Sequence, residues 1–222
     1  MSEDELYSAK VPEQFKSVFL DAQKKMEVLF EKINKNPSKG RLTIQDERYL
    51  LIRAESLANG FISEATDVVG EKAAEMLLYN FAYSIGKKEA KAFVEKFNLS
   101  DPVEKLSAGP VYFSFVGLAF VDIFPESKPA PDDSYFLIYE HPHTFESEAY
   151  EKKGEQTDHG ICFFSAGYSA GWCSEAFGLE LETREISCVA KGDDSCRFIM
   201  APYGKLVEHL DKKDEYLSIS HE

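Results

Sequence analysis

The four cysteines are the residues of this sequence whose type and spacing could do chemistry. None occurs in the first 161 residues; they are Cys162, Cys173, Cys188 and Cys196. Cys188 and Cys196 flank the turn KGDD of a predicted β-hairpin, so their two thiols can meet. Zinc takes about four ligands at the corners of a tetrahedron, with each sulfur roughly 2.3 Å from the metal. Two further ligands are therefore needed.

Cys162 and Cys173 cannot both reach the same metal if they lie on one continuous helix. They are eleven residues apart, which is roughly 16 Å along a helix axis. The spacing does not say which of the two joins the hairpin. Buried free thiols remain the alternative, since cysteine is among the most buried residue types. A carboxylate or an imidazole would supply the fourth ligand, and the candidates in range are Glu185, Asp193, Asp194 and His159.

The first half of the chain, which must position part of this site, is mainly helical in pattern. Apolar residues at three- and four-residue steps predict a helix over 12–34, and NKNPSKG at 34–40 ends it. The apolar stripe of this helix needs a partner, either its own domain or a second copy of the chain. The following segments are predicted as a short strand at 41–45, an apolar run of undecided type at 48–54, helices across 55–98 with breaks near Gly70 and Gly86, and a helical turn that begins at Asp101 and Pro102.

The second half changes in character and predicts an α+β fold. GPVYFSFVGLAFVDIF, at 109–124, is aromatic and β-branched, which favours a strand, a bend and a second strand. The remaining segments are predicted as a strand at 134–140, a helix with small residues on one face at 161–176, a β-hairpin at 179–200 and a short polar helix at 205–217. We therefore expect an antiparallel sheet packed with helices, with an N-terminal helical extension.

The charge of the chain argues against several classes of partner. Its formal net charge of −14 would repel the phosphate backbone of nucleic acids, and no cluster of Lys and Arg is visible. No apolar run approaches the roughly 20 residues that span a bilayer. The acidic start MSEDELYSAK is not a secretory signal. We expect a cytoplasmic protein that contacts neither nucleic acid nor membrane directly.

Two stretches resemble known families. CFFSAGYSAGW at 162–172, followed by EISCVAKGDDSCRF at 185–198, resembles the 4-vinyl reductase domain. The segment from Gly40 to Phe97, with RYLLIRAESL, resembles the XylR-type N-terminal sensor segment of activators of aromatic catabolism. The resemblance implies a fold similar to the ligand-binding fold of NO-signalling and TRAPP proteins. It divides the chain into an N-terminal helix with a possible role in dimerisation (1–40), the sensor segment (41–108), the 4-vinyl reductase domain (109–203) and a connector helix (204–222).

The resemblance also implies a structural zinc on Cys162, Glu185, Cys188 and Cys196, and it leaves Cys173 out. Glu185 and Cys188 are three residues apart, so a flat strand would turn them to opposite faces. We therefore predict a β-bulge between them. Four protein ligands leave no open position for water or substrate, which is typical of a structural metal.

An enclosed, mainly aromatic effector pocket beside the zinc is a further implication of the resemblance. Phenol sensors of the family bind the hydroxyl with a His and a Trp. Counted back without gaps from Cys162, these positions hold Phe113 and His141 here, so we expect phenol to fit poorly unless His141 compensates. A flat apolar ligand with one polar edge suits the predicted lining, although each residue could instead be ordinary core: Phe113, Tyr139, His141, Tyr168 and Trp172.

The resulting hypothesis is a zinc-containing sensor of a small aromatic or hydrophobic effector. It would regulate transcription or signalling through an attached or partner output domain, a sigma-54 ATPase or a histidine kinase, as a homodimer. The alternative is a tetrapyrrole-binding protein related to bacteriochlorophyll synthesis; an assembly role like that of TRAPP subunits has no specific support. No GxGxxG fingerprint follows a strand and no GxxxxGK[ST] motif occurs, so we expect no enzyme.

Overall fold

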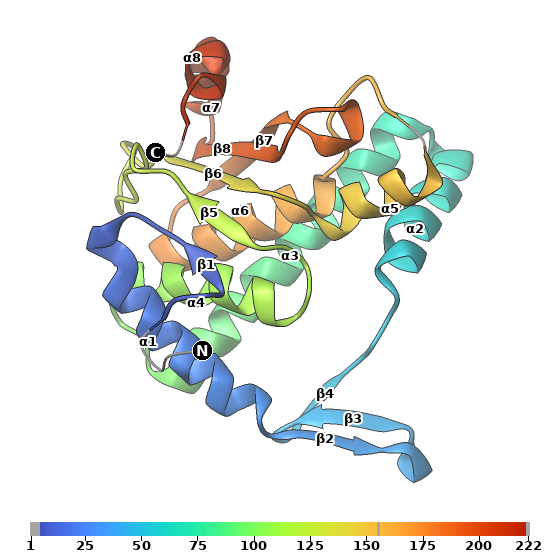
Figure 1. Cartoon of the computed structure of the whole chain (residues 1–222), viewed down its shortest axis with the longest axis vertical. Coiled ribbons are helices and arrows are strands. Elements are labelled where there is room, and N and C mark those ends of the chain that lie inside the picture. Colours follow the sequence, from blue (N-terminus) through green and yellow to red (C-terminus); the bar gives the residue numbers. More distant parts are fainter. Residues whose placement is uncertain (1–4, 155, 221–222) are drawn as a thin grey trace.

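The computed structural model describes residues 5–154 and 156–220 of the chain. A five-stranded sheet in the order β1-β5-β6-β8-β7 lies at its centre (Figure 1). β1 runs parallel to β5, and the other neighbouring strands are antiparallel. The predicted α+β class is confirmed, with one parallel pair that the sequence pattern did not reveal. The strands are β1 Ala9–Lys10, β5 Val121–Ile123, β6 Leu137–His141, β7 Leu181–Ser187 and β8 Cys196–Pro202.

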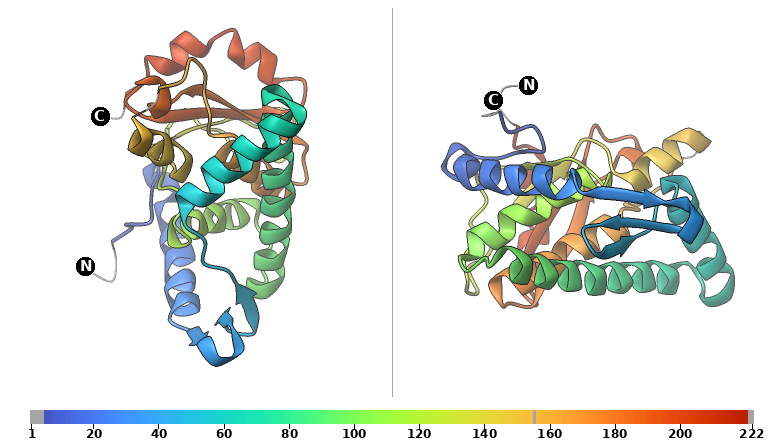
Figure 2. Two further views of the ribbon diagram at one scale, coloured as in Figure 1. Left: turned by 90° about the vertical axis from the view of Figure 1, so that its right-hand side faces the viewer. Right: turned by 90° about the horizontal axis from the view of Figure 1, so that it is seen from below.

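Helices cover both faces of this sheet. α3, α4 and α6 lie on one face, and α7 and α8 lie on the other (Figure 2). α1 packs along α4, which is one of the two partners predicted for its apolar stripe. The helices are α1 Glu13–Phe30, α2 Ala54–Val69, α3 Glu71–Phe97, α4 Pro102–Phe115, α5 Phe145–Lys153, α6 Phe163–Phe177, α7 Leu206–Leu210 and α8 Lys213–Leu217.

A second, three-stranded antiparallel sheet projects from the end of α1 (Figure 1). Its strands are β2 Ile33–Asn36, β3 Arg41–Ile44 and β4 Glu47–Tyr49, with the short 3₁₀ helix Pro37–Lys39 between the first two. The predicted strand at 41–45 is confirmed. The apolar run at 48–54 is not one element, because it ends β4, continues without regular structure and enters α2 at Ala54.

The segment 109–124 differs from its prediction, because its first part is the helix α4 and only Val121–Ile123 is a strand. Asp101 accepts hydrogen bonds from the amides of Val103 and Glu104, which caps the start of this helix. α4 is enclosed by other elements, and even Tyr112 on its flank is only 5% exposed. A helix that is buried on all sides has no polar face, so its sequence looks like that of a strand.

Gly86 does not break a helix, contrary to the prediction, since α3 runs through it without interruption. A Cβ at Gly86 would collide with the backbone carbonyl of Tyr168, and one at Gly167 would collide with that of Tyr79. These glycines allow the backbones of α3 and α6 to touch. The small residues predicted on one face of the 161–176 helix therefore have their expected use. The connector predicted at 205–217 is present as two short helices, α7 and α8.

Candidate metal centre and ligand pocket

Three cysteines and one glutamate converge beneath the turn between β7 and β8. Cys162 stands at the N-terminal end of α6, Glu185 lies on β7, Cys188 follows that strand, and Cys196 begins β8. The Sγ atom of Cys162 is 3.5 Å from that of Cys196 and 3.9 Å from that of Cys188. Cys196 and Cys188 are also 3.9 Å apart at sulfur. One ligand atom from each of the four residues lies within 4.8 Å of the others.

These distances fit a tetrahedral metal ion. Four ligands at the Zn–S distance give sulfur–sulfur separations of about 3.8 Å, close to those observed. The Glu185 carboxylate adds a second observation. Its Oε2 accepts a hydrogen bond of 3.0 Å from the Cys162 amide, whereas its Oε1 is buried with no partner among the described residues. A buried charged oxygen without a partner is unfavourable, and a cation bound there would supply that partner.

The predicted bulge between Glu185 and Cys188 is confirmed. Glu185 pairs with Phe198 and Ser187 pairs with Arg197, so β7 spends one extra residue against β8 at this point. The extra residue returns Cys188 to the face that Glu185 occupies. Without it, the carboxylate and the thiol would lie on opposite sides of the sheet.

The surroundings of the cluster support anionic ligands only when a cation is present. Burial raises the pKa of Cys162 and of Glu185 well above their ordinary values, and nearby acidic groups add to both shifts. The amide of Val189 points at the Cys196 sulfur at 3.4 Å, as donors to thiolates do. Asp193, a candidate fourth ligand by spacing, accepts a hydrogen bond from the Cys188 amide instead and holds the turn.

Two other spacing candidates lie away from the cluster. The imidazole of His159 is bound by Glu75 and Asp158, at 2.9 and 2.7 Å. Cys173 lies in the middle of α6 and lines a cavity, in agreement with the helix-length argument that it cannot share a metal with Cys162.

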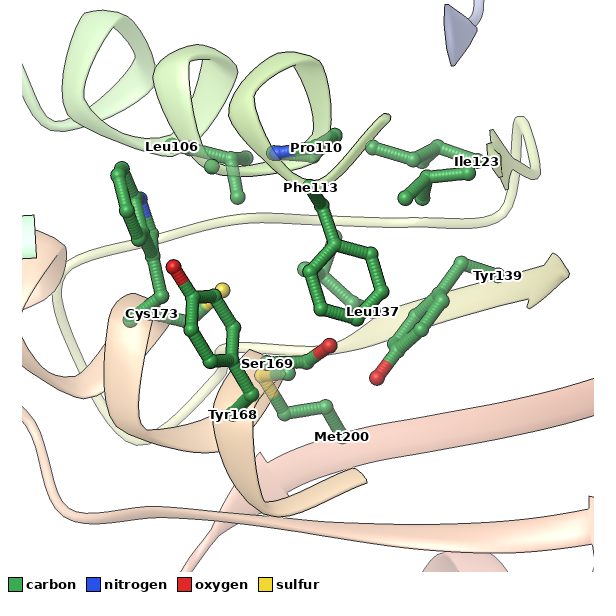
Figure 3. Close-up of a pocket in the computed structure, with 13 residues that line it drawn as sticks. Leu106, Pro110, Phe113, Ile123, Leu137, Tyr139, Tyr168, Ser169, Cys173 and Met200 are labelled. Carbon is green, nitrogen blue, oxygen red and sulfur yellow. The ribbon is translucent and has the colours of Figure 1, made fainter. Parts of the chain in front are cut away.

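The cavity lies between α4, α6 and the sheet, and its empty space is about 400 Å³ (Figure 3). Its walls are almost entirely apolar. Of the five residues predicted to line it, four do so: Phe113, Tyr139, Tyr168 and Trp172. The ring centroid of Phe113 is 5.2 Å from that of Tyr168. The sequence reasoning missed Ser169 and Cys173, although both follow Tyr168 on the helix that was predicted to form a wall.

His141 is fully buried but lies behind the cavity wall, in ring contact with Phe113, Tyr139 and Phe198. Its Nδ1 is 2.8 Å from the carbonyl oxygen of Phe120. A carbonyl only accepts, so Nδ1 carries the proton and Nε2 is an acceptor. Burial lowers the pKa of His141 to about 4, and Nε2 has no partner among the described residues.

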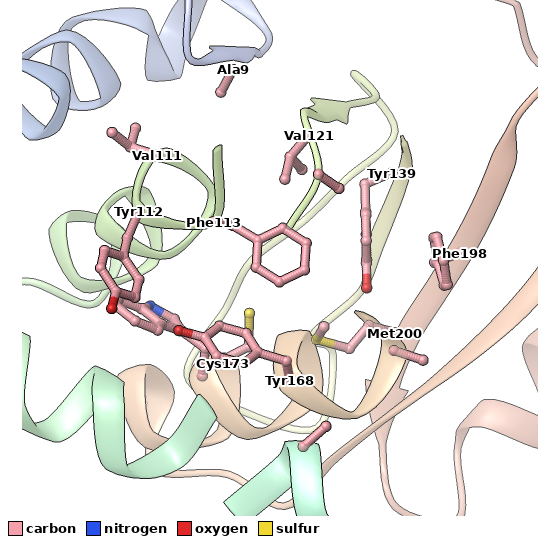
Figure 4. Packing of buried hydrophobic residues seen from close by; sticks show 14 of the residues in the cluster. Ala9, Val111, Tyr112, Phe113, Val121, Tyr139, Tyr168, Cys173, Phe198 and Met200 are labelled. Atoms are coloured by element: carbon pink, nitrogen blue, oxygen red, sulfur yellow. The ribbon is translucent and has the colours of Figure 1, made fainter. Parts of the chain in front are cut away.

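Two hydroxyl groups in the cavity wall are also buried and unsatisfied. The hydroxyl oxygens of Tyr139 and Tyr168 have no hydrogen-bond partner within the described ranges. Burial raises the pKa of Tyr168 well above its ordinary value, so the group stays protonated. Trp172 differs, because its Nε1 already donates to the Lys105 carbonyl at 2.9 Å. Trp172 is therefore a wall, and Tyr139 and Tyr168 keep hydrogen-bonding capacity for a ligand (Figure 4).

Comparison with known proteins decides the family. The 4-vinyl reductase domain matches residues 146–202, and the family described as "Activator of aromatic catabolism" matches residues 29–125. The chain combines these two segments. Its three predicted internal boundaries stay predictions, and the main hydrophobic core extends across them.

Named relatives agree with this assignment. The phenol regulator MopR of Acinetobacter guillouiae is 23% identical over 199 residues, which are 89% of this chain and 34% of the relative. The transcriptional regulatory protein XylR of Pseudomonas putida is 22% identical over 174 residues, or 78% of this chain and 31% of that protein. The chain thus spans about a third of the length of these relatives. Both are named as regulators, in agreement with the expectation that the chain is not an enzyme.

A solved structure confirms the fold of this chain. The phenol-responsive sensory domain of the transcription activator PoxR, determined with phenol, superimposes with a TM-score of 0.71 at 18% identity. The match covers 86% of this chain and 94% of the PoxR domain. No helix within residues 5–154 and 156–220 is long and apolar enough to cross a bilayer.

Proposed function

We propose that this protein is the sensory part of a transcription or signalling regulator and that it binds a flat, mainly apolar aromatic effector in the cavity between α4 and α6. The observation that carries the proposal is an apolar cavity whose wall holds two buried, unpartnered tyrosine hydroxyls. Ligand pockets combine such apolar walls with a few polar groups that fix orientation. The named relatives, which include a phenol regulator and a phenol-responsive domain, support the proposal.

The effector should carry a hydrogen-bond donor. His141 offers a lone pair at Nε2, and the nearby hydroxyls of Tyr139 and Tyr168 can accept as well as donate. Phe113 occupies the position that resembles the imidazole of phenol sensors and has no polar atom. A compact ring with one N–H or O–H group is therefore the expected class, with the ring against Phe113 and the donor towards the buried acceptors.

Indole and 1-methylindole form a matched pair of probes for this idea, because they differ by one N–H donor. A ligand that prefers the folded state raises the melting temperature, so we expect a larger rise with indole. The preference should shrink in His141→Ala and stay intact in His143→Ala, since His143 is a largely exposed neighbour. If neither probe raises the melting temperature, and isothermal calorimetry with phenol also shows no binding, the cavity is not an aromatic site.

We further propose that the metal on the four-residue cluster is zinc, held for structural reasons. The sulfur separations and the unpartnered Glu185 oxygen support a tetrahedral ion, and thiolates with one carboxylate suit zinc. When bound, the metal would fasten the β7–β8 turn to the start of α6. It would leave the cavity wall formed by Tyr168 and Trp172 in a fixed place without entering the cavity itself.

A homodimer and an attached output domain, a sigma-54 ATPase or a histidine kinase, complete the proposal. Three consecutive apolar residues between β4 and α2 support the dimer: Leu50, Leu51 and Ile52 are 74%, 90% and 57% exposed. Such a contiguous apolar segment marks an interaction site more often than isolated surface residues do. The proposed output domain would be joined at the α7–α8 end of the sensor.

A further inference from the structure

Strand β6 turns alternate side chains to opposite faces of the central sheet. Leu137 and Tyr139 face the helices and line the cavity. Ile138 and Glu140 face the other way, where Ile138 belongs to a separate small core. The strand that forms part of the cavity wall is thus also the floor of a second site on the back of the sheet.

Strand β8 has the same two-sided arrangement. Met200 lines the cavity and Phe198 stacks on Tyr139, with centroids 5.3 Å apart. Ile199 lies in the separate core on the back, which residues of the C-terminal helices cover. The members of this back core and of its cover are Phe124, Phe136, Ile138, Ile186, Ile199, Ala201, Leu206, Leu210, Tyr216 and Ile219.

Arg197, also on the back of β8, joins the C-terminal segment to β6. Its Nη1 lies 2.7 Å from the carbonyl oxygen of Tyr216, 2.9 Å from that of Ile219 and 3.3 Å from that of Leu217. Its Nη2 and Nε donate to Glu140 Oε2 at 3.0 and 3.3 Å. The two side chains are only 12% and 17% exposed, so solvent screens this ion pair less than a surface pair. One guanidinium therefore bridges the sheet and the end of α8.

Aromatic contacts complete the cover. The ring of Phe136 stacks on His209 of α7 at 4.3 Å and 16° and lies 5.2 Å from the ring of Tyr216. His209 Nδ1 is 2.8 Å from the Tyr216 hydroxyl, which ties α7 to α8. The guanidinium of Arg197 also lies 4.5 Å from the ring centroid of Phe124. α7 and α8 thus dock as one unit on the back of the sheet.

We infer that the back of the central sheet is the output surface of the sensor, with Arg197 as the positioning residue that latches the segment 206–219 to it. The signal that this latch would transmit rests on the proposed effector binding. Tyr139 and Glu140 are neighbours on β6, so a displacement of the cavity wall moves the carboxylate that holds Arg197. An effector would act on 206–219 through two strands, with no contact of its own to that segment.

Hydrogen–deuterium exchange of the whole chain without effector tests the latch. Arg197→Lys keeps the charge but cannot bridge Glu140 and the three carbonyls, because an ammonium lacks the planar fork of guanidinium. We expect exchange in 206–219 to rise about tenfold or more, as the loss of a charge-assisted hydrogen bond predicts, while α3 and α6 keep their protection. Arg184→Lys is the matched control, since Arg184 lies exposed on the adjacent β7. An equal rise in both variants, or an equal rise in α6, overturns the latch.

A second pair of variants tests the coupling across the sheet. Phe113→Leu alters the cavity wall and removes the ring contact to His141 of β6, so exchange in 206–219 should rise by a few-fold. Val111→Ala is the control: Val111 is fully buried in the same helix but does not line the cavity. Tyr139→Phe repeats the test with almost no change in volume. Unchanged exchange in both cavity variants overturns the coupling, whereas failure to find an aromatic ligand would bear only on the proposed function.

Discussion

Replacing Phe113 by histidine should turn this protein into a better binder of phenol. Phe113 is 2% exposed and lines the cavity. A histidine there is neutral, because burial disfavours its charged form. One of its ring nitrogens lacks a partner in the apolar wall. An unsatisfied buried group costs about 1–3 kcal/mol, which lowers the melting temperature of a domain of this size by about 2–12 °C.

Phenol would restore that loss by supplying the missing hydrogen bond. The same 1–3 kcal/mol then appears as an affinity gain of about 5- to 150-fold over the unmodified chain. Calorimetric titration with phenol and with anisole, which lacks the O–H donor, measures the gain and its origin. Phe145→His is the matched control, since Phe145 is a buried aromatic residue outside the cavity lining. Equal affinities of Phe113→His for phenol and anisole would refute the reasoning.

Three further predictions concern the metal, the pH dependence and the assembly. Cys196→Ser should abolish a one-to-one zinc content in native mass spectrometry and lower the free energy of unfolding by several kcal/mol, because binding and folding are coupled at such sites; Cys173→Ser should keep the zinc, and equal zinc contents would contradict the assignment. Burial lowers the pKa of His141 from 6.5 to about 4, so the unfolded chain binds more protons between these values, and stability should fall by about 3 kcal/mol as the pH drops from 6.5 to 4. The difference between the unmodified chain and His141→Phe isolates this contribution from acid release of the metal, and identical pH profiles would exclude it. Leu51→Asp should convert a dimer into a monomer in light scattering, with Lys35→Asp, on the exposed strand β2, as the control; a monomeric unmodified chain at micromolar concentration would contradict the dimer.

The metal cluster was predictable because its chemistry is local in sequence. Cys188 and Cys196 flank one turn, and the three-residue step from Glu185 to Cys188 required the bulge that β7 contains. The choice of Cys162 over Cys173 came from the family resemblance, because spacing excluded only their joint use. The position of His141 behind the wall, and not in it, depends on how β6 packs against Phe113, which no local pattern contains.

The cavity was harder to predict for the same reason. α4 supplies one wall, yet its sequence lacks a polar face because the helix is enclosed on all sides. Ser169 and Cys173 could have been found by continuing the helical step from Tyr168, since they lie one and five residues further on. The contacts of Arg197 with the C-terminal carbonyls join residues about 20 positions apart through tertiary packing alone, and periodicity does not reveal such contacts.

The close approach of α3 and α6 has a mechanical consequence. Gly86 and Gly167 remove the side chains that would cushion the two helices, so the pair behaves as a single stiff beam, anchored at one end beside Cys162. Any adjustment to a guest molecule must then be made by the more compliant side of the hollow, the strands that carry Tyr139 and Met200. A wider residue at Gly167 would spread the beam, and it would displace the anchored end and the hollow by the same lever.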